Sequence, residues 1–381
     1  MIILDEKGWM CMKKPERIFV IGHKNPDTDS ICSAIAYADI KNRTTQNKKY
    51  IPKRAGQINE ETRYVLNRFG VQPPAYLGNI GTQVKDMDIR TSPQADKNMS
   101  LKNTWDLMQE NGIVSLPIRD KDGCLEGLVT IGDIAKTYMD TTDSYLLSNA
   151  RTQYQRIAET VGGEVVEGNG HGYFVKGRVL VGTANPKMLE GYVEEDDMII
   201  MGDREEDHLQ AISQNVSCII VGLNIVVSEK VIKLAHEKNI VIIRSPYDTF
   251  NIARLINQSI PVSFVMKRDN MVTFNTEDFT DDIQDVMIKN RHRAFPVINP
   301  HGKCIGTISR RNFLDMHKKK VVLVDHNEVD QAVDNIEKAE ILEIIDHHKL
   351  GTLQTMTPVA FRNEPVGCTG CLLYTSPSPR D

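Results

Sequence analysis

Two segments of the chain share one order of apolar, polar and glycine positions, at a constant offset of 179 residues. Each starts with apolar residues at helical spacing, as in Leu101, Trp105 and Met108, and continues with two short apolar runs around a glycine turn. Each then ends in a hydroxyl residue that opens a second helical stretch. The aligned pairs include Asp106 with Asp285, Met108 with Met287, Asn111 with Asn290, Pro117 with Pro296, Gly123 with Gly302, Gly127 with Gly306, and Thr130 with Ser309. The pattern predicts a duplicated helix–strand–strand–helix unit.

The segment between the two copies alternates between apolar runs and amphipathic stretches. The runs at 198–201, 219–221 and 240–243 predict strands. Apolar positions at helical spacing predict helices at about 228–237 and 248–256. This order is typical of an α/β domain.

Three further apolar runs lie outside the repeat, and acidic and imidazole side chains follow each of them. Residues 17–21 lead into Gly22-His23-Lys24-Asn25-Pro26-Asp27-Thr28-Asp29-Ser30 and then into a predicted helix. Residues 321–324 lead into Asp325-His326-Asn327-Glu328, and residues 341–345 lead into Asp346-His347-His348. Sites in open α/β sheets form at the carboxyl ends of parallel strands. We therefore expect the three clusters to converge at one edge of a parallel sheet.

The side chains in these clusters are candidate metal ligands. A mixed nitrogen and oxygen donor set suits Mn, Co or Zn better than Ca, and no thiolate lies nearby in the sequence. Alternatively, Asp27 and Asp29 are helix caps and His23 is a core histidine, which is the better reading of a lone His23. Three candidate ligands within seven residues favour the metal site.

The repeat resembles the CBS domain, at roughly 84–140 and 262–318, and paired CBS domains imply a cleft for adenine nucleotides. Thr130 and Ser309 lie where a hydroxyl and helix amides can hold a phosphate. Asp133 is placed to accept hydrogen bonds from ribose hydroxyls, whereas Asn312 replaces the usual Asp in the second copy. Arg291 and His292 can add phosphate or base contacts. Alternatively, Thr130 and Ser309 are plain N-caps and the basic residues form a solvated face.

The motif series around His23, Asp325 and Asp346 resembles that of the family II inorganic pyrophosphatases of the DHH superfamily. Gly202-Asp203-Arg204 is similar to the DRTGG domain, and CBS and DRTGG modules interrupt the DHH domain in one subgroup of that family. The resemblance implies an α/β fold in which a parallel-sheet DHH domain is interrupted by a CBS pair and an α/β DRTGG-like domain.

The resemblance also implies a role for each residue of the metal motifs. His23 and Asp27 would bind one metal, Asp29 and His347 the second, and Asp325 would bridge both. His348 would contact the substrate phosphate, so that Asp325 and His348 are the expected catalytic residues. Asp346 would orient His347 from outside the ligand set. The metals would activate water for in-line attack on one phosphorus and neutralise the phosphate oxygens.

The implied cofactors are two divalent ions, Mn or Co, while Mg can accompany the substrate. The implied partners are pyrophosphate, adenine nucleotides (AMP, ADP, ATP or diadenosine polyphosphates) and a second copy of the chain. AMP or ADP would inhibit, and ATP-like or diadenosine nucleotides would activate. Two alternatives remain open: another DHH-family phosphodiesterase acting on a cyclic dinucleotide or oligonucleotide, or a non-catalytic adenine-nucleotide sensor.

The composition fits this reading. Hydrophobic residues make up 40% and charged residues 25% of the 381 residues, as in ordinary globular proteins. The net charge of −5 gives no broad electrostatic grip on nucleic acid. No apolar run approaches the roughly 20 residues of a membrane helix. Seven scattered cysteines indicate free thiols in a cytoplasmic protein.

We expect the domains to follow one another in the order in which these patterns occur. They are a first part of the DHH domain at 13–80, CBS 1 at 84–140, a DRTGG-like domain at 145–257, CBS 2 at 260–318, and a second DHH part at 320–370. Residues 371–381 match a translated sequencing adapter and are excluded from the expected fold.

The same resemblance yields a first prediction. Family members continue beyond the Asp-His-His motif with a further Asp ligand and with a DHHA2 domain whose Lys and Arg residues grip pyrophosphate. The chain as written is therefore expected to have little or no pyrophosphatase activity. Full-rate phosphate release from purified residues 1–370 would contradict this expectation.

Overall fold

The computed structural model describes residues 2–4, 10–12, 16–139, 143–182, 191–314 and 316–374. The chain divides into two compact units. The first consists of 1–88, 277–289 and 311–381, and the second of 89–276 and 290–310. Neither unit is continuous in sequence, since the chain leaves the first and later returns to it. Near the N-terminus, β1 (Ile2–Leu4) pairs antiparallel with β2 (Met10–Met12).

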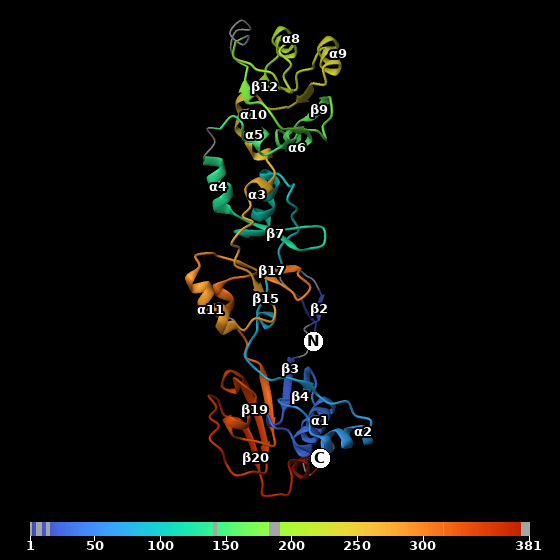
Figure 1. Cartoon of the computed structure of the whole chain (residues 1–381), viewed down its shortest axis with the longest axis vertical. Coiled ribbons are helices and arrows are strands. Elements are labelled where there is room, and N and C mark those ends of the chain that lie inside the picture. Colours follow the sequence, from blue (N-terminus) through green and yellow to red (C-terminus); the bar gives the residue numbers. More distant parts are fainter. Residues whose placement is uncertain are drawn as a thin grey trace. The chain divides into compact units, whose positions relative to one another are not determined.

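A six-stranded parallel sheet forms the first unit, in the order β20-β19-β18-β3-β4-β5. Strands from both ends of the chain are therefore neighbours in one sheet, drawn in blue and red in Figure 1. The strands are β3 (Glu16–Ile21), β4 (Lys48–Arg54), β5 (Ala75–Tyr76), β18 (Lys320–Val324), β19 (Glu340–Asp346) and β20 (Ala360–Asn363). The sheet confirms the predicted fold class, an interrupted α/β domain with a parallel sheet.

Both faces of this sheet are buried, as expected for parallel strands. On one face, Ile18, Val20 and Val322 pack with α1 (Thr28–Thr44). On the other face, Ile21 and Leu323 pack with the loop after β18. The unit also contains α2 (Glu60–Arg68), α11 (Thr280–Lys289), α12 (Thr369–Tyr374), and the 3-10 helices η1 (Val84–Asp86), η5 (Val329–Gln331) and η6 (Ile336–Lys338).

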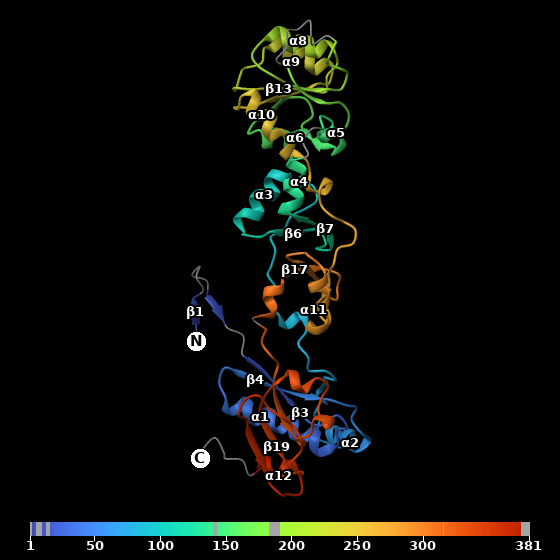
Figure 2. The same ribbon diagram turned by 90° about the vertical axis from the view of Figure 1, so that its left-hand side faces the viewer.

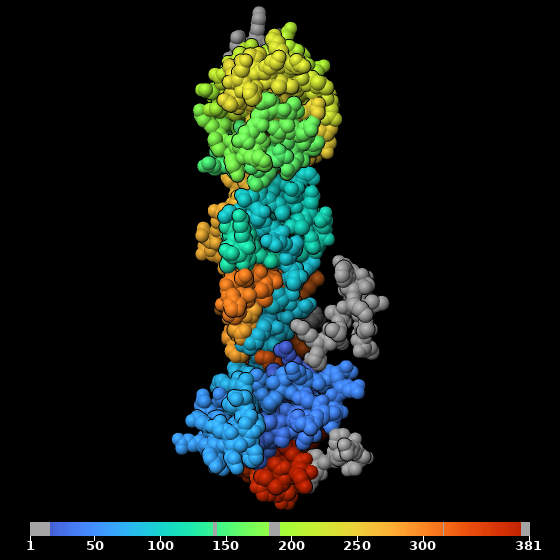
Figure 3. Space-filling model, turned by 90° about the vertical axis from the view of Figure 1, so that its right-hand side faces the viewer, coloured from blue at the N-terminus to red at the C-terminus, as the bar shows by residue number. Residues whose placement is uncertain are grey.

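Helix α12 packs against α1, so that a late segment of the chain, drawn in red, lies beside an early one, drawn in blue (Figure 3). Residues 371–374 belong to this helix, and their Leu372 and Leu373 are buried in the core beside α1. The structure thus includes in the fold four residues of the segment that the sequence analysis set aside. Residues 375–381 of that segment lie outside the described residues.

The second unit contains a five-stranded sheet in the order β11-β12-β13-β14-β9. Helices α8 (Glu205–Ser213) and α9 (Glu229–Glu237) cover one face, and α6 (Tyr154–Thr160) and α10 (Thr249–Leu255) cover the other (Figure 2). The strands are β9 (Glu164–Glu167), β11 (Val179–Val181), β12 (Met198–Met201), β13 (Cys218–Val221) and β14 (Val241–Arg244), with β9 antiparallel to β14. The predicted strands and helices of this segment are confirmed.

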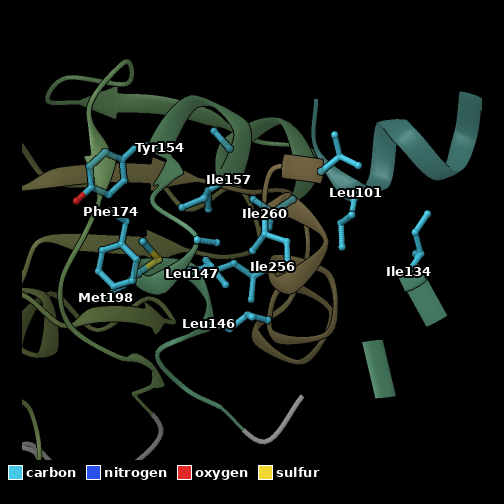
Figure 4. Close-up of a cluster of buried hydrophobic side chains, with 14 of the residues drawn as sticks. Leu101, Ile134, Leu146, Leu147, Tyr154, Ile157, Phe174, Met198, Ile256 and Ile260 are labelled. Atoms are coloured by element: carbon cyan, nitrogen blue, oxygen red, sulfur yellow. The ribbon is translucent and has the colours of Figure 1, made fainter. Parts of the chain in front are cut away.

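The first copy of the repeat forms α3 (Leu101–Glu110), β6 (Ser115–Arg119), β7 (Leu125–Thr130) and α4 (Ile131–Met139). Its core is continuous with that of the following α/β segment. Leu101 and Ile134 lie in the same hydrophobic cluster as Ile157, Phe174 and Met198 (Figure 4). The cluster also includes residues of α5 (Leu146–Asn149), η2 (Ile256–Ser259) and β10 (Tyr173–Phe174), and β10 pairs with the short strand β8 (Thr152–Gln153).

Two details of the repeat differ from the prediction. Trp105 is 38% exposed, and Thr104 is buried in its place, because its hydroxyl bonds the Ser100 carbonyl within the helix. In the second copy, β16 (Phe295–Ile298) and β17 (Cys304–Ile308) form as predicted, beside β15 (Phe274–Asn275). The helix after Ser309 is only a 3-10 turn, η4 (Arg310–Phe313). Another 3-10 helix, η3 (Val262–Phe264), precedes this copy.

Among the described residues, no helix combines the length and the apolar character that crossing a membrane requires.

Candidate metal centre

The carboxyl ends of β3, β18 and β19 lie side by side, and the predicted ligands follow these three strands. From β3 the sheet continues to β4 in one direction, and from β18 it continues to β19 in the other. The β3–β18 boundary is therefore a topological switch point, where open α/β sheets form their ligand sites. Gly22 follows β3 with no space for a side chain, since a Cβ would lie 1.9 Å from Ser30 Oγ.

Asp325 occupies the middle of this edge. The residue is 1% exposed, and its φ of +64° is in the left-handed region that non-glycine residues rarely adopt. Its Oδ2 lies 3.4 Å from His23 Nε2, and its Oδ1 lies 3.3 Å from His347 Nε2. One carboxylate thus separates two imidazoles that come from opposite ends of the chain. A strained backbone at such a position is a common feature of functional sites.

The first ligand group consists of His23, Asp27 and Asp325, whose ligand atoms lie within 4.8 Å of one another. Asp27 Oδ1 is 3.8 Å from His23 Nε2 and also accepts the Ser30 N–H, so that Asp27 caps α1. The capping alternative for Asp27 therefore holds together with its position near His23. Burial lowers the pKa of His23, but the Asp325 carboxylate 3.4 Å away, together with the other carboxylates, outweighs it and leaves the pKa raised.

The second group with this ligand spacing consists of Asp325, His347 and His348. His347 Nδ1 contacts the Val366 carbonyl at 3.1 Å, which requires a proton on Nδ1 and leaves the Nε2 lone pair facing the carboxylates. Asp29 Oδ2 lies 3.8 Å from His347 Nε2. Asp29 therefore lies beside His347, but the group whose ligand atoms all lie within 4.8 Å of one another contains His348 in place of Asp29.

Asp29 is held by donors that sequence reasoning missed. The backbone N–H groups of Thr369 and Gly370 donate to its two oxygens at 2.6 and 3.0 Å, and Ser33 Oγ donates at 3.1 Å. Thr369 also donates its hydroxyl to Asp325 Oδ1 at 2.9 Å. One residue of α12 thus contacts two of the predicted ligands. Its distance in sequence from both carboxylates left no signal from which to find it.

Asp346 holds the neighbouring histidine rather than the expected one. Its Oδ1 accepts the ring Nδ1–H of His348 at 2.8 Å, but from His347 it accepts only the backbone N–H. The ring of His347 is oriented by Val366 instead. Burial favours a higher pKa for Asp346, but hydrogen bonds from His348, Asn327 and two backbone amides outweigh it and lower the pKa. Asp346 is therefore a buried carboxylate kept ionised by its donors.

His326 is the one imidazole of the three motifs that faces the interior. It is 1% exposed, its Nδ1 contacts the Val324 carbonyl at 2.9 Å, and burial lowers its pKa to about 4. It is therefore neutral near pH 7. Its ring lies edge-on to that of His23, with centroids 6.4 Å apart, so that it packs behind a predicted ligand.

The residues fit a pair of divalent cations. Within the described residues, Asp325 Oδ2 is buried without a hydrogen-bond partner. Burial raises the pKa of Asp325, and so do the charges of Asp29 and Asp27, which indicates that negative charge is concentrated at this edge. Both ligand groups contain only imidazole nitrogens and carboxylate oxygens, the donors that Mn, Co and Zn accept. No thiol belongs to either group in the part of the chain that is described.

The residues predicted for nucleotide binding are partly engaged with one another. Thr130 donates its N–H and its hydroxyl to Asp133 Oδ2 at 3.0 and 2.6 Å, and Asp133 N–H donates back to the hydroxyl at 3.2 Å. Lys267 pairs with Asp133 Oδ1 at 3.1 Å. This reciprocal pair is a capping box at the start of α4. Thr130 is therefore an N-cap in this structure, as the alternative interpretation of the sequence proposed.

The remaining candidates of this set differ in their surroundings. Arg291 is exposed, and His292 packs edge-on against Phe295 at 5.9 Å. Ser309 is half-buried before η4, and Asn312 donates its Nδ2 to the Asp88 carbonyl at 2.6 Å. Asn312 belongs to the first unit, whereas the other five candidates belong to the second.

Replacing Asp325 tests the metal centre. In Asp325→Asn, the group between the two imidazoles loses its charge, and we expect Co²⁺ affinity to fall at least about 100-fold, since even indirect supports of metal ligands contribute 10- to 100-fold. The measurement is titration of the visible absorption of bound Co²⁺. Asp330→Asn removes the same charge from an exposed position in η5 and should leave binding unchanged. Equal affinity of Asp325→Asn and the parent chain would exclude this centre.

Two curated relatives match nearly the whole chain. One, from Clostridium perfringens, is named "Cobalt-dependent inorganic pyrophosphatase" and is 39% identical over 93% of this chain and 65% of its own length. The other, from Thermotoga maritima, is named "Probable manganese-dependent inorganic pyrophosphatase" and is 37% identical over 95% of this chain and 66% of its own length. The chain thus spans just under two thirds of the length of these relatives.

Domain families and a solved structure match the inserted region. The CBS domain matches residues 84–140 and 262–319, and the DRTGG domain matches residues 156–259. A crystal structure of the CBS and DRTGG domains of the regulatory region of Clostridium perfringens pyrophosphatase, complexed with the activator diadenosine tetraphosphate, is 32% identical with a TM-score of 0.57. It covers 60% of this chain and is itself covered completely. The chain belongs to the family of cobalt- and manganese-dependent inorganic pyrophosphatases that carry CBS and DRTGG domains.

Proposed function

We propose that the metal centre serves the hydrolysis of inorganic pyrophosphate to two phosphates with two divalent cations, Mn or Co, while the chain as written is expected to release little phosphate by itself. The observation that carries the proposal is the position of Asp325, with one oxygen 3.4 Å from His23 and the other 3.3 Å from His347. A carboxylate between two imidazoles is the arrangement that a bridging ligand of two metals needs. The names of the relatives support the same metals and substrate.

The residues divide between the two cations. His23 and Asp27 would hold one, Asp29 and His347 the other, and Asp325 both. When bound, the cations supply Lewis-acid activation of water and neutralise phosphate oxygens. The neighbouring carboxylates raise the pKa of His23, so that protons compete with a metal ion for this ring at a higher pH than for a free imidazole, and metal affinity falls as the pH falls.

His348 is placed to contact the substrate. Its side chain is 51% exposed, and its Nδ1 is engaged by Asp346, so that Nε2 is the nitrogen left for a phosphate oxygen. In its doubly protonated form His348 donates from Nε2, and the Asp346 carboxylate behind it stabilises that charge. This is the only direct substrate contact that we assign to a side chain in the described residues.

Titration with pyrophosphate tests the substrate. We expect pyrophosphate to change the electron paramagnetic resonance spectrum of the chain loaded with two equivalents of Mn²⁺, because it contacts both ions. Any phosphate that is released should require the metal and disappear in Asp325→Asn. The matched probes are the non-hydrolysable imidodiphosphate and a cyclic dinucleotide.

The outcomes separate the alternatives. Faster turnover of the cyclic dinucleotide than of pyrophosphate would replace the proposal with a DHH-family phosphodiesterase. A Mn²⁺ spectrum that does not respond to any of these phosphates would replace it with a non-catalytic nucleotide sensor. A response shared by pyrophosphate and imidodiphosphate, but absent with the cyclic dinucleotide, supports pyrophosphate as the substrate.

We also propose that adenine nucleotides regulate the metal centre from the inserted domains. The relative's regulatory region binds diadenosine tetraphosphate as an activator. In this chain, a bound nucleotide would replace the hydrogen bond between Thr130 and Asp133 and the ion pair between Asp133 and Lys267. In this proposal, AMP and ADP act as inhibitors, and ATP or diadenosine polyphosphates act as activators. A homodimer formed by the CBS pairs and a cytoplasmic location belong to the same proposal.

Contacts within the first unit give this regulation a route. Helix α11 lies inside the second CBS match, and its Thr280 N–H donates to the Thr82 carbonyl at 3.0 Å. Asp281 of the same helix pairs with Lys338 in η6. In the same loop, the Gln331 carbonyl accepts the Lys24 N–H at 2.7 Å, one residue beyond His23. A movement of α11 therefore reaches the metal-ligand loop through residues 331–338.

Breaking the contact between α11 and η6 tests the route. In Lys338→Ala, we expect diadenosine tetraphosphate to bind as before, while its effect on Co²⁺ affinity falls at least about fivefold, the low end of ordinary coupling. The measurement is calorimetric titration of Co²⁺ with and without the nucleotide. Lys230→Ala, an exposed lysine in α9, is the control. Full coupling in Lys338→Ala would show that the signal takes another course.

A further inference from the structure

Asn327 lies two residues beyond Asp325, and both the nitrogen and the oxygen of its carboxamide form hydrogen bonds. The residue is 5% exposed. Its Nδ2 donates to Asp346 Oδ2 and, at 2.9 Å, to the Lys349 carbonyl, while its Oδ1 accepts the Gly351 N–H. Rotating the amide by half a turn would place its oxygen against two acceptors and its N–H groups against a donor. The partners therefore fix a single orientation.

The carboxylate that Asn327 contacts has no freedom of its own. Asp346 is completely buried. Its Oδ1 accepts the backbone N–H of His347 at 2.8 Å, the backbone N–H of His348 at 3.2 Å, and His348 Nδ1 at 2.8 Å. Asn327 is the side-chain donor to the opposite oxygen. The plane of the carboxylate is thus set from both ends, by Asn327 on Oδ2 and by the 347–348 turn on Oδ1.

His348 receives its orientation from this carboxylate. The imidazole is half exposed and stacks loosely beside His347, with ring centroids 4.2 Å apart. Packing alone does not fix the ring, because an imidazole flipped by 180° about Cβ–Cγ occupies nearly the same volume while exchanging Nδ1 with Cδ2 and Nε2 with Cε1. The ionised Oδ1 of Asp346 does fix it, since it accepts a proton from Nδ1, which the flipped ring would replace with a carbon. The other nitrogen then faces outward.

We propose that Asn327 is a positioning residue that acts through Asp346 to hold the ring of His348 with Nδ1 protonated and Nε2 facing the phosphate. The proposal rests on the function assigned above to His348. A simpler role is also available to Asn327, because it joins the 346–351 segment to the loop after β18 through Lys349 and Gly351. The test therefore needs a measurement that loop fastening alone would not change.

Long-range ¹H–¹⁵N NMR of the imidazole rings supplies that measurement. It is made on the metal-free chain with ¹⁵N-labelled histidine, and His348→Gln assigns the signal. We expect the parent chain to show one neutral tautomer of His348, protonated at Nδ1. In Asn327→Asp, an acceptor replaces the donor opposite Asp346, and we expect a mixture of both tautomers. Asn363→Ala removes a side chain that donates to the His348 carbonyl at 2.8 Å but does not contact Asp346, and should leave the signal unchanged.

Reciprocal replacement provides a rescue. The double variant Asn327→Asp, Asp346→Asn reverses donor and acceptor, so the hydrogen bond between the two side chains can form again and an amide oxygen can face His348 Nδ1. We expect the single tautomer to return at least in part. If Asn327→Asp does not fold, Asn327→Ala gives the same comparison. A single unchanged tautomer in both variants would overturn the proposal.

A double-mutant cycle then connects the tautomer to substrate binding. With two equivalents of Mn²⁺ bound, we expect Asn327→Asp to weaken pyrophosphate affinity about five- to tenfold, the size of one misplaced hydrogen bond to a charged group. In a His348→Gln background, the same substitution should add no further loss. Additive losses would mean that Asn327 acts through the loops. If the parent chain does not bind pyrophosphate, the proposed function fails, while the tautomer experiment still decides the role of Asn327.

Discussion

The structure depends on a buried carboxylate that lies between two imidazoles. Asp325 is held at a left-handed φ of +64°, almost without exposure, and one of its oxygens has no hydrogen-bond partner among the described residues. Burying an ionised carboxylate in this way is unfavourable unless positive charge compensates it. His23 can supply part of that charge only while it is protonated. The arrangement is therefore least stable when Asp325 is ionised and His23 is neutral, and metal ions would supply the positive charge that is then missing. The fold of the sheet edge is in this way connected directly to its chemistry.

This interaction can form only because strands from both ends of the chain are neighbours. Strands β3 and β18 pair in parallel although almost 300 residues separate them, so the chain, which leaves this sheet after β5, must return to place β18 beside β3. Lys319 holds the two crossing points together. It is 10% exposed and contacts the Gly81 carbonyl at 2.9 Å and Asp86 Oδ2 at 3.0 Å. This mostly buried lysine thus joins the outgoing segment of the chain to the returning segment just before β18.

The sequence predicted the parallel sheet and the convergence of its ligand clusters, because both follow from local patterns and from a general rule about strand ends. It did not predict which side chain fixes which histidine. The assignment of Asp346 to His347 was wrong in its ring contact, since the choice between adjacent imidazoles depends on the turn after β19. Thr369 was missed because a hydroxyl residue far from every ligand has no distinguishing pattern. Trp105 was placed on the buried face by its apolar character, although Thr104 satisfies its hydroxyl within the helix and is buried instead.

The two copies of the repeat show how aligned positions, Asp133 and Asn312, can have different roles. In the first copy, Asp133 closes a capping box with Thr130, and a nine-residue α4 follows. In the second copy, Asn312 donates to the Asp88 carbonyl, and only the 3-10 turn η4 follows. A carboxylate accepts from helix amides and from ribose hydroxyls alike, whereas this carboxamide already directs its N–H group at the outgoing segment of the chain. The first copy therefore keeps the carboxylate that the proposed nucleotide site would use, and the second exchanges it for a contact within the unit that carries the metal centre.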